Sequence, residues 1–447
     1  MFLVLKQTWA LMLGVLLLML GNGLQGTLLG VRGSLENIDS ATMGYIMAGY
    51  FLGFLGGSKA TPIMLNRVGH VRVFAALGSL VSAAFILYAA VVDPIAWWLL
   101  RVLVGFCFSG IYVVAESWLN HSASNDSRGQ ALSLYLIVQM AGMVLGQLLL
   151  NVADPSGYNL FIIITVLVSV SFAPMLLSAA SKAPVQTATR AMPLRELIST
   201  SPLASFGVLL LGGIYAVLYA MSPVYATERG LSIAQTSYFI TAIFVGAMLC
   251  QYPIGWLSDR MDRRVLIIGV TAVGACVALL GMYSGDSIEV LMFCAFMLGG
   301  SANPLYSLLV AYANDYLEQD QMASAAGGLL FINGFGAMTG PIVVGYAMSN
   351  LGIEWFFITL VLLLSTICLY GIYRMSQRTY TVLEESSPYL PISARSSGLA
   401  TEFALSAAED EQLEELEESE EVFESRPYDE KVLQRIDGQD EPSRSGG

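Results

Sequence analysis

Long apolar runs, each close to the length of a bilayer-spanning helix, recur along most of this chain. A membrane-spanning helix needs about 20 predominantly apolar residues. Spans of this kind are predicted at residues 8–30, 42–63, 73–92, 96–118, 130–152, 158–180, 203–224, 235–257, 265–284, 288–312, 324–348 and 354–375. The pattern therefore predicts an all-α polytopic membrane protein with twelve transmembrane helices.

A polar break divides these runs into two sets of six. It covers residues 181–201 and contains Pro184 and Pro193. We therefore expect an N-terminal six-helix half (1–180), a cytoplasmic linker (181–201), a C-terminal six-helix half (202–376) and a tail (377–447). Paired halves of this kind suggest the internal repeats that are common in transporters.

The charge lies mainly in the tail. Residues 1–375 carry 15 Lys/Arg and 16 Asp/Glu, whereas residues 376–447 carry 6 and 18. Its acidic run at 409–424 cannot bury a core, which predicts a disordered acidic cytoplasmic tail. Two interpretations stay open for it: a solvated tail, or a regulatory or partner-binding segment that contacts the basic loops.

Composition also excludes several classes of function. With 55% hydrophobic residues and no basic cluster beyond short loops, the chain is not expected to bind nucleic acid or to be a soluble enzyme. Its five cysteines lie within apolar runs without paired spacing, and its two histidines lie in separate loops. We therefore expect no metal site, no cofactor and no catalytic residues.

The basic residues favour one orientation in the membrane. If the amino terminus is cytoplasmic, 13 Lys/Arg lie in cytoplasmic segments, against Arg32 and Arg229 outside. The positive-inside rule then predicts that both termini lie in the cytoplasm. The membrane that we expect for this integral protein is the bacterial cytoplasmic (inner) membrane. The loop at 313–323 departs from the rule, because it carries acidic residues and no Lys or Arg.

Two equivalent loops carry a family resemblance. The loop after the eighth span reads Gly255-Trp-Leu-Ser-Asp259-Arg260-Met-Asp262-Arg263-Arg264, and the loop after the second span is a degenerate copy of it. The later loop resembles the signature G-x-x-x-D-R-x-G-R-R of the major facilitator superfamily, with Asp262 in place of the second glycine. Arg101-Val-Leu-Val-Gly105 resembles the R-x-x-x-G element of that superfamily.

Further segments resemble the YcaD-like branch of the superfamily. They include Glu116-Ser-Trp-Leu-Asn120 and Pro304-Leu-Tyr-Ser307. The resemblance implies alternating access by rocking of the two halves, with a small-molecule substrate, the lipid bilayer as surroundings and a monomeric state. It also assigns close helix packing to Gly142, Gly146, Gly340 and Pro341.

In this fold spans one, four, seven and ten are expected to line a central cavity. Each of these spans places polar side chains on one helical face. The candidate substrate-binding residues are Arg101, Asn22, Gln25, Tyr112, Tyr215, Tyr219, Asn303 and Tyr306.

Arg101 is the strongest of these candidates. A charge at mid-membrane costs at least about 2.5–3.5 kcal/mol. Glu116 lies on the same span but about 22 Å further along the helix. Arg101 could therefore bind a substrate carboxylate or phosphate, or it could snorkel or be hydrogen-bonded to Gln25 or backbone carbonyls.

Acidic and basic residues also face each other at the cytoplasmic ends of both halves. The resemblance implies a conformational latch that favours the outward-open state, formed by Arg67, Arg72, Glu116, Asp259, Arg260, Arg263, Arg264 and Asp315. The alternative is a set of interfacial charges that only fix helix register.

The expected function is secondary active or facilitative transport of a small solute that is anionic, zwitterionic or drug-like. Coupling to a proton or another ion stays open, because spans one, seven and ten show no Asp, Glu or His in their interior. A non-transporting membrane sensor on the same scaffold is the alternative.

Overall fold

The computed structural model describes residues 2–122, 128–177, 192–285 and 287–377, together with Tyr389 and Ala404. The predicted linker up to residue 191 and the rest of the tail lie outside the described residues. The first half contains α1 (Phe2–Leu35), α2 (Ser40–Val68), α3 (His70–Ala90), α4 (Pro94–Ser122), α5 (Arg128–Leu148), the 3-10 turn η2 (Leu149–Asn151) and α6 (Asn159–Leu177).

The second half begins with a short helix that the sequence did not predict, α7 (Leu194–Thr200). It continues with α8 (Pro202–Ala216), the π-helical turn η3 (Val217–Met221), α9 (Ser222–Glu228), α10 (Ile233–Ser258), α11 (Arg263–Met282), α12 (Ile288–Asn314), α13 (Gln319–Leu351) and α14 (Trp355–Met375). The chain is thus all-helical throughout its described elements, as predicted.

A helix covers each of the twelve predicted spans, but the described residues do not establish all twelve as membrane helices. Ten helices in the described part of the chain are long and apolar enough to cross a bilayer, counting Pro202–Glu228 as one, while α2 and α6 fall short. In α6, the uninterrupted stretch of described residues runs over Asn159–Pro174, which is shorter than a full membrane span. In α2, five glycines and Lys59 lower the mean hydropathy.

The two halves repeat the same helix crossings through glycine. In the α2–α4 crossing, a Cβ on Gly105 would lie 1.9 Å from the Tyr50 carbonyl oxygen. In the α10–α12 crossing, a Cβ on Gly246 would lie 1.9 Å from the Phe296 carbonyl oxygen. Such backbone contacts are open only to glycine, and small residues are the usual means of close helix packing in membranes. The two halves, whose loops resemble each other in sequence, therefore also share the same type of close helix packing.

The four predicted packing residues all lie at helix crossings. A Cβ on Gly142 would lie 2.5 Å from Met19 Cβ, and one on Gly146 would lie 2.6 Å from the Leu20 carbonyl oxygen, both where α5 crosses α1. On α13, a Cβ on Gly340 would come within 3.0 Å of the Gly213 backbone in α8. The carbonyl of Pro341 lies only 2.2 Å from a Cβ built on Gly44 of α2.

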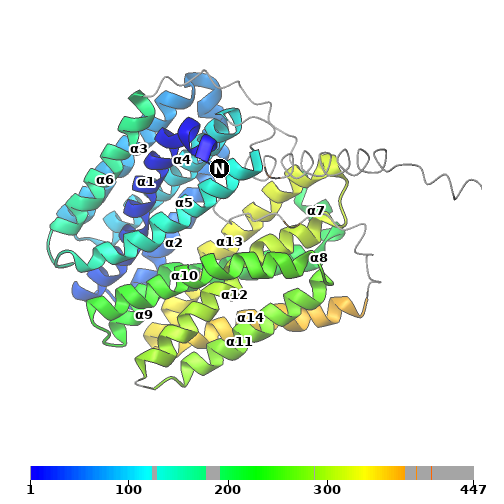
Figure 1. The fold of residues 1–447 in the computed structure, drawn as a ribbon. Helices are drawn as coiled ribbons and strands as arrows, with labels where there is room; N and C mark the ends of the chain where they lie inside the picture. Colours follow the sequence, from blue (N-terminus) through cyan, green and yellow to red (C-terminus); the bar gives the residue numbers. More distant parts are fainter. Residues whose placement is uncertain are drawn as a thin grey trace, which may run out of the picture.

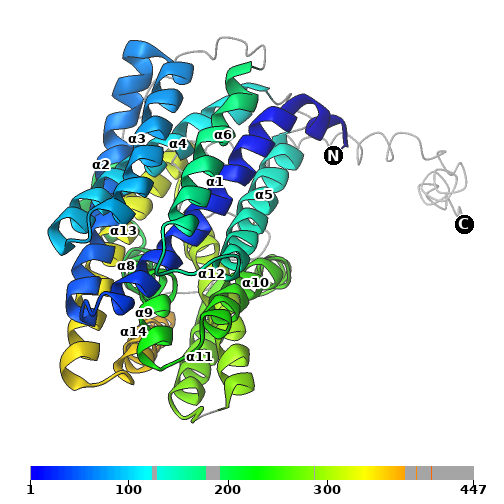
Figure 2. The same ribbon diagram turned by 90° about the vertical axis from the view of Figure 1, so that its left-hand side faces the viewer.

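The bundle has two ends, a basic face and an opposite face. The basic face carries the α2–α3 turn with Arg67, the α10–α11 loop with Arg260, and the end of α14. The opposite face carries the α1–α2 turn and the α9–α10 turn. Figures 1 and 2 show the halves as two bundles in which α13 lies beside α2, and α5 ends close to α10.

Contacts between the halves concentrate toward the opposite face. There the Ser34 and Thr227 hydroxyls are 2.7 Å apart, joining α1 to α9. Nearby, the Asn151 amide donates to the Ser237 hydroxyl at 2.9 Å, joining η2 to α10. Only the α2–α13 contact is described further toward the basic face, where the Lys59 ammonium lies 4.3 Å from the centre of the Phe331 ring.

Candidate functional site

A cavity of about 110 Å³ lies between the two halves, near the middle of the helices. Its wall takes residues from α1, α2, α4 and α5 of the first half and from α8, η3, α10, α12 and α13 of the second. The lining residues are Asn22, Gly23, Gln25, Gly26, Thr27, Tyr50, Phe51, Phe54, Arg101, Met140, Met143, Gln147, Tyr215, Tyr219, Ala220, Phe244, Asn303, Leu330, Asn333, Gly334 and Ala337. A site shared by both halves changes shape when the halves move relative to each other.

Arg101 is the one charged residue on this wall within the described chain, and it is only 4% exposed. Its Nη1 donates to Gln25 Oε1 at 3.1 Å, and its Nη2 lies 2.8 Å from Met47 Sδ. The Tyr50 ring lies 5.3 Å from the guanidinium carbon, within cation–π range. No carboxylate among the described residues pairs with it, so the charge is held only by neutral groups.

One donor of this guanidinium and one donor of the neighbouring amide have no acceptor among the described residues. They are Arg101 Nε and Gln25 Nε2, and both atoms are buried. The Gln25 amide is oriented by the hydrogen bond that its Oε1 accepts from Arg101, so its Nε2 hydrogens remain unused. A buried donor without an acceptor costs about 1–3 kcal/mol. An acceptor-bearing ligand in the cavity would remove this cost.

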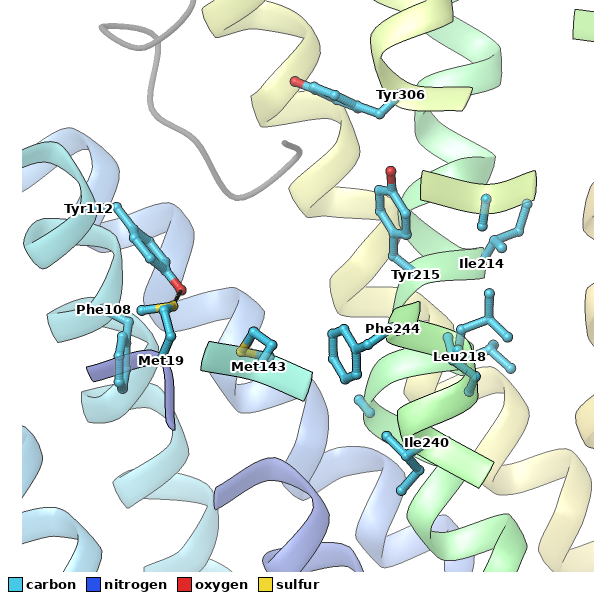
Figure 3. Packing of buried hydrophobic residues seen from close by; sticks show 14 of the residues in the cluster. Met19, Phe108, Tyr112, Met143, Ile214, Tyr215, Leu218, Ile240, Phe244 and Tyr306 are labelled. Carbon is cyan, nitrogen blue, oxygen red and sulfur yellow. Dashed lines mark hydrogen bonds between the residues drawn. The ribbon is translucent and has the colours of Figure 1, made fainter. Parts of the chain in front are cut away.

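The second half contributes aromatic rings to the wall. The Tyr215 and Tyr219 rings are 5.8 Å apart, and the Tyr219 and Phe244 rings are 4.8 Å apart. Figure 3 shows Phe244 directed toward the first half, with Met143 opposite it. Both halves thus contribute aromatic rings and amides to the same space, whereas the one cation of the described wall, Arg101, comes from the first half.

A break in the seventh span helps to present these rings. Its helix changes to a π-helical turn at Val217–Met221, which contains Tyr219 and Ala220 of the wall. Pro223 follows directly in α9, and proline cannot donate the backbone hydrogen bond of a regular helix. Single π turns often occur at functional sites. The proline was visible in the sequence, but the π turn was not predicted.

Amide side chains complete the polar part of the wall. The Gln147 amide nitrogen donates to the Gly23 carbonyl at 2.7 Å, and its oxygen accepts from the Thr27 hydroxyl at 2.5 Å. Asn333 donates to the Val208 carbonyl at 3.1 Å. Both amides therefore join neighbouring helices while also lining the cavity.

Six of the eight predicted substrate-binding residues line this cavity: Asn22, Gln25, Arg101, Tyr215, Tyr219 and Asn303. Tyr215 also donates from its hydroxyl to the Asn303 carbonyl at 3.1 Å. Of the four helices expected to form the wall, α4 contributes only Arg101 and α12 only Asn303.

Tyr112 and Tyr306 were also predicted on the wall, and the structure places neither of them there. The Tyr112 hydroxyl is used within the first half, where it accepts from Asn22 at 3.2 Å and lies 3.5 Å from Met19 Sδ. Tyr306 is 2% exposed and lies further along α12 than Asn303, toward the basic face. Figure 3 shows it well separated from Phe244. Helical spacing alone did not reveal these differences in depth.

Several wall residues were missed because they lie on helices outside the predicted set. Tyr50, Phe51 and Phe54 come from α2, and Phe244 comes from α10. Their sequence signal is weak, since aromatic residues on an apolar helix are equally suited to packing. Pro223 was the better available signal, because it marks the break in the seventh span.

At the basic face, the predicted latch residues of the second half lie together. The Arg263 guanidinium donates to the Asp315 carboxylate, and their side chains are 4% and 7% exposed. Arg263 also donates to the Ala311 carbonyl at 3.2 Å and lies 3.9 Å from the Asp259 carboxylate. This buried arginine is therefore neutralised by its own half.

Asp262, which replaces the signature glycine, has a local role. It caps α11 by accepting from the Arg264 amide at 2.9 Å, and its carboxylate pairs with the Arg264 side chain at 2.8 Å. Its φ is −55°, so the position does not require glycine. Arg260 instead stacks on Trp256, with its guanidinium carbon 4.3 Å from the ring centre.

The first half has a different arrangement at this face. Glu116 is 3% exposed and accepts a hydrogen bond from the Tyr135 hydroxyl at 3.4 Å. Arg67 and Arg72 are exposed and form no ion pair with a described residue. The expected pairing of Glu116 with these two arginines is therefore absent from the described contacts in this state.

These features define the class of protein: an integral membrane protein built from two repeated helix bundles around a central polar and aromatic cavity. The Major Facilitator Superfamily model matches residues 11–248 and 204–396. The chain belongs to the Major Facilitator Superfamily and is a membrane transporter.

Relatives of known sequence support the YcaD-like branch. The uncharacterized MFS-type transporter YcaD of Escherichia coli O7:K1 (strain IAI39 / ExPEC) is 26% identical over 353 residues, covering 78% of this chain and 90% of the relative. The uncharacterized MFS-type transporter Ent638_1421 of Enterobacter sp. (strain 638) is 26% identical over 345 residues, covering 76% and 88%.

Solved structures agree on the fold. The nucleoside transporter NupG matches with a TM-score of 0.69 at 14% identity, covering 84% of this chain and all of that chain. A bacterial homolog of the human lysosomal transporter Spinster, in its inward-facing and occupied conformation, matches with a TM-score of 0.67 at 14% identity, covering 86% and 98%. At this level of identity the likeness concerns the fold alone.

Proposed function

We propose that the chain carries a small solute with a negatively charged group across the bacterial inner membrane by rocker-switch alternating access. The observation that carries this proposal is Arg101, a buried cation on the wall between the halves that no described carboxylate neutralises. An intramembrane charge of this kind is expensive, and such charges usually serve function. A substrate carboxylate or phosphate would supply the missing counter-charge.

The chemistry of the wall limits the solute further. The unused donors of Arg101 and Gln25 fit an oxyanion that accepts two hydrogen bonds. The rings of Tyr215, Tyr219 and Phe244 fit an apolar or planar body. A zwitterionic or drug-like compound with an acidic group also satisfies this description.

The contacts between the halves fit a transporter that is closed on the opposite face. α1 meets α9, and η2 meets α10, near that face. The positive-inside rule assigns the basic face to the cytoplasm, together with both termini. We therefore interpret this conformation as inward-facing.

The cluster around Arg263 is proposed as one part of the conformational latch. In this state Asp315 and Asp259 approach Arg263 within the second half. Removing either acid would change the balance between states without removing a substrate contact. Asp315→Ala, which removes a latch acid that does not contact the tail, should therefore favour the inward-open state, as measured by the accessibility of cysteine probes on the basic face. Unchanged accessibility would contradict the proposal.

Transport is tested by two experiments in sequence. The purified protein is first screened by thermal shift against amino acids, organic acids, sugars, nucleosides and drugs, because a ligand that binds only the folded state stabilises it. Hits are then tested for uptake into proteoliposomes with and without a pH gradient, since the fucose:proton symporter FucP shares this fold at a TM-score of 0.53.

Two variants make the flux assay specific for the cavity. Arg101→Gln should strongly reduce uptake of anionic hits, whereas the control Met47→Leu removes only the sulfur contact and should retain uptake. A protein that binds its ligand but gives no net flux would be a sensor rather than a transporter. Arg101→Gln protein with unchanged affinity and uptake would sink the assigned role of Arg101.

A further inference from the structure

Tyr389 of the C-terminal tail is seated on the basic end of α10. The Gln251 amide donates to its hydroxyl at 2.9 Å, and its own backbone N–H donates to the Asp259 carboxylate at 3.0 Å. Its ring lies against Gly255, where a Cβ would come within 2.7 Å of the ring. Gln251, Gly255 and Asp259 are spaced by four residues, so they form one helical face.

This face is shaped to receive an aromatic ring. Gly255 leaves the space that the Tyr389 ring occupies, and any larger residue would collide with it. Burial also raises the pKa of the Tyr389 phenol, and its hydroxyl oxygen accepts the hydrogen bond from Gln251. The contact thus combines one packed ring, one side-chain hydrogen bond and one backbone hydrogen bond.

The same contact connects the tail to the cavity and to the charged cluster. Gln251 Oε1 accepts from the amide of Asn303, a wall residue, at 3.0 Å. At the other end, the Asp259 oxygen that receives the Tyr389 N–H also lies 3.9 Å from Arg263. A single tail residue therefore contacts both a partner of the cavity wall and an acid of the proposed latch.

We propose that the face formed by Gln251, Gly255 and Asp259 is a docking site for the Tyr389 segment of the chain's own tail, and that docking holds the basic face open. This inference rests on the proposed alternating access. Closure of the basic face must bring the basic ends of the two halves together, as Asn151 and Ser237 now join at the opposite face. Tyr389 occupies the end of α10 that this movement needs.

The sequence around Tyr389 is suited to such a role. Pro388 precedes it and Pro391 follows two residues later. Proline restricts its own backbone in any chain, so less conformational entropy is lost when the segment docks. The tail would act as a tethered ligand, whose effective concentration at the site is high because the tether is short.

The test measures the distance between the halves at the basic face in the full-length protein. Spin labels at Asn66→Cys and Tyr373→Cys, both exposed positions, report the distance in a background whose native cysteines are replaced. Tyr389→Ala should raise the ratio of closed to open basic face by about ten- to hundredfold, because it removes the packed ring as well as one net hydrogen bond. Tyr389→Phe keeps the ring and should give a smaller change.

Controls separate docking from general effects of the tail. Tyr428→Ala, which alters a more distant tail tyrosine, should leave the distances unchanged. Deletion of residues 378–447 should match Tyr389→Ala, and a peptide of residues 384–394 added to the deleted protein should restore the open distances, whereas a scrambled peptide should not. Unchanged distances in both Tyr389→Ala and the deletion would overturn the inference. Uptake assays judge the proposed function separately, so either proposal can fail alone.

Discussion

Arg101 in the first half and Arg263 in the second are both buried, yet their surroundings treat the charge in different ways. Arg263 donates to the carboxylate of Asp315, to a backbone carbonyl and to the Ser258 hydroxyl. Arg101 has an amide, a thioether and an aromatic face, and its Nε has no acceptor among the described residues. One arginine is neutralised within its own half, whereas the other still lacks a counter-charge.

The difference shows that burial of an arginine does not by itself indicate whether the residue serves stability or substrate binding. Removing one partner of a buried ion pair leaves an uncompensated charge, which is strongly destabilising. A cation that never had a fixed partner leaves no such charge behind when it is replaced. Substitutions at the two arginines should therefore separate stability from transport.

The largest expected effect is on stability at the Arg263 pair. Asp315→Ala should lower the free energy of unfolding by up to about 3–5 kcal/mol, because it leaves the Arg263 charge buried with only the more distant and more exposed Asp259 carboxylate. Thermal unfolding in detergent or nanodiscs measures the change. The double variant Arg263→Met with Asp315→Leu should recover most of the loss, and a double variant as unstable as Asp315→Ala would contradict the paired-charge explanation.

The next effect is on transport at Arg101. Arg101→Gln should reduce uptake of an anionic substrate by roughly 10- to 100-fold, which corresponds to about 1.5–3 kcal/mol for hydrogen bonds to a charged group. Its unfolding should stay close to that of the parent protein, since no carboxylate is orphaned. Arg101→Lys keeps the charge without the forked geometry and should recover only part of the uptake. A large loss of stability in Arg101→Gln would show that the two arginines are alike after all.

A third experiment compares the repeated helix crossings. Gly105→Ala and Gly246→Ala each place a methyl group 1.9 Å from a carbonyl oxygen, so each should cost about 1–3 kcal/mol through overpacking. Gly269→Ala is the control, because nothing lies within 4 Å of its Cβ position. The comparison uses the temperature at which each variant aggregates. Unequal costs at Gly105 and Gly246 would mean that only one half depends on its crossing.

The fold was largely predictable from the sequence, because apolar length and loop charge report directly on membrane helices. The exceptions have physical causes. α2 covers the span predicted at 42–63, although its glycines and Lys59 lower its hydropathy, whereas α7 is a short helix inside a segment predicted as a linker. The π turn at Val217–Met221 depends on how Pro223 is accommodated by neighbouring helices, which a sequence pattern does not describe.

The candidate site was predictable in part. Helical spacing placed Arg101 and Gln25 among the candidates, and the hydrogen bond between them is the one named as the alternative to substrate binding at Arg101. Helical spacing could not determine how far along each helix the cavity extends, so Tyr112 and Tyr306 were assigned to a wall that they do not line. It also could not identify Tyr389, because a tyrosine in a polar tail carries no signal until its docking partner on α10 is known.

The smallest expected effect concerns the loop residue that departs from the family signature. Asp262 pairs with Arg264 at a partly exposed position, and such pairs contribute about 0.2–1 kcal/mol. Asp262→Gly should therefore lower the free energy of unfolding by no more than about 1 kcal/mol, with high salt reducing the difference further. Asp315→Ala serves as the reference measured in parallel. An equal loss of stability in both variants would contradict the expectation that a buried ion pair contributes more than a partly exposed one.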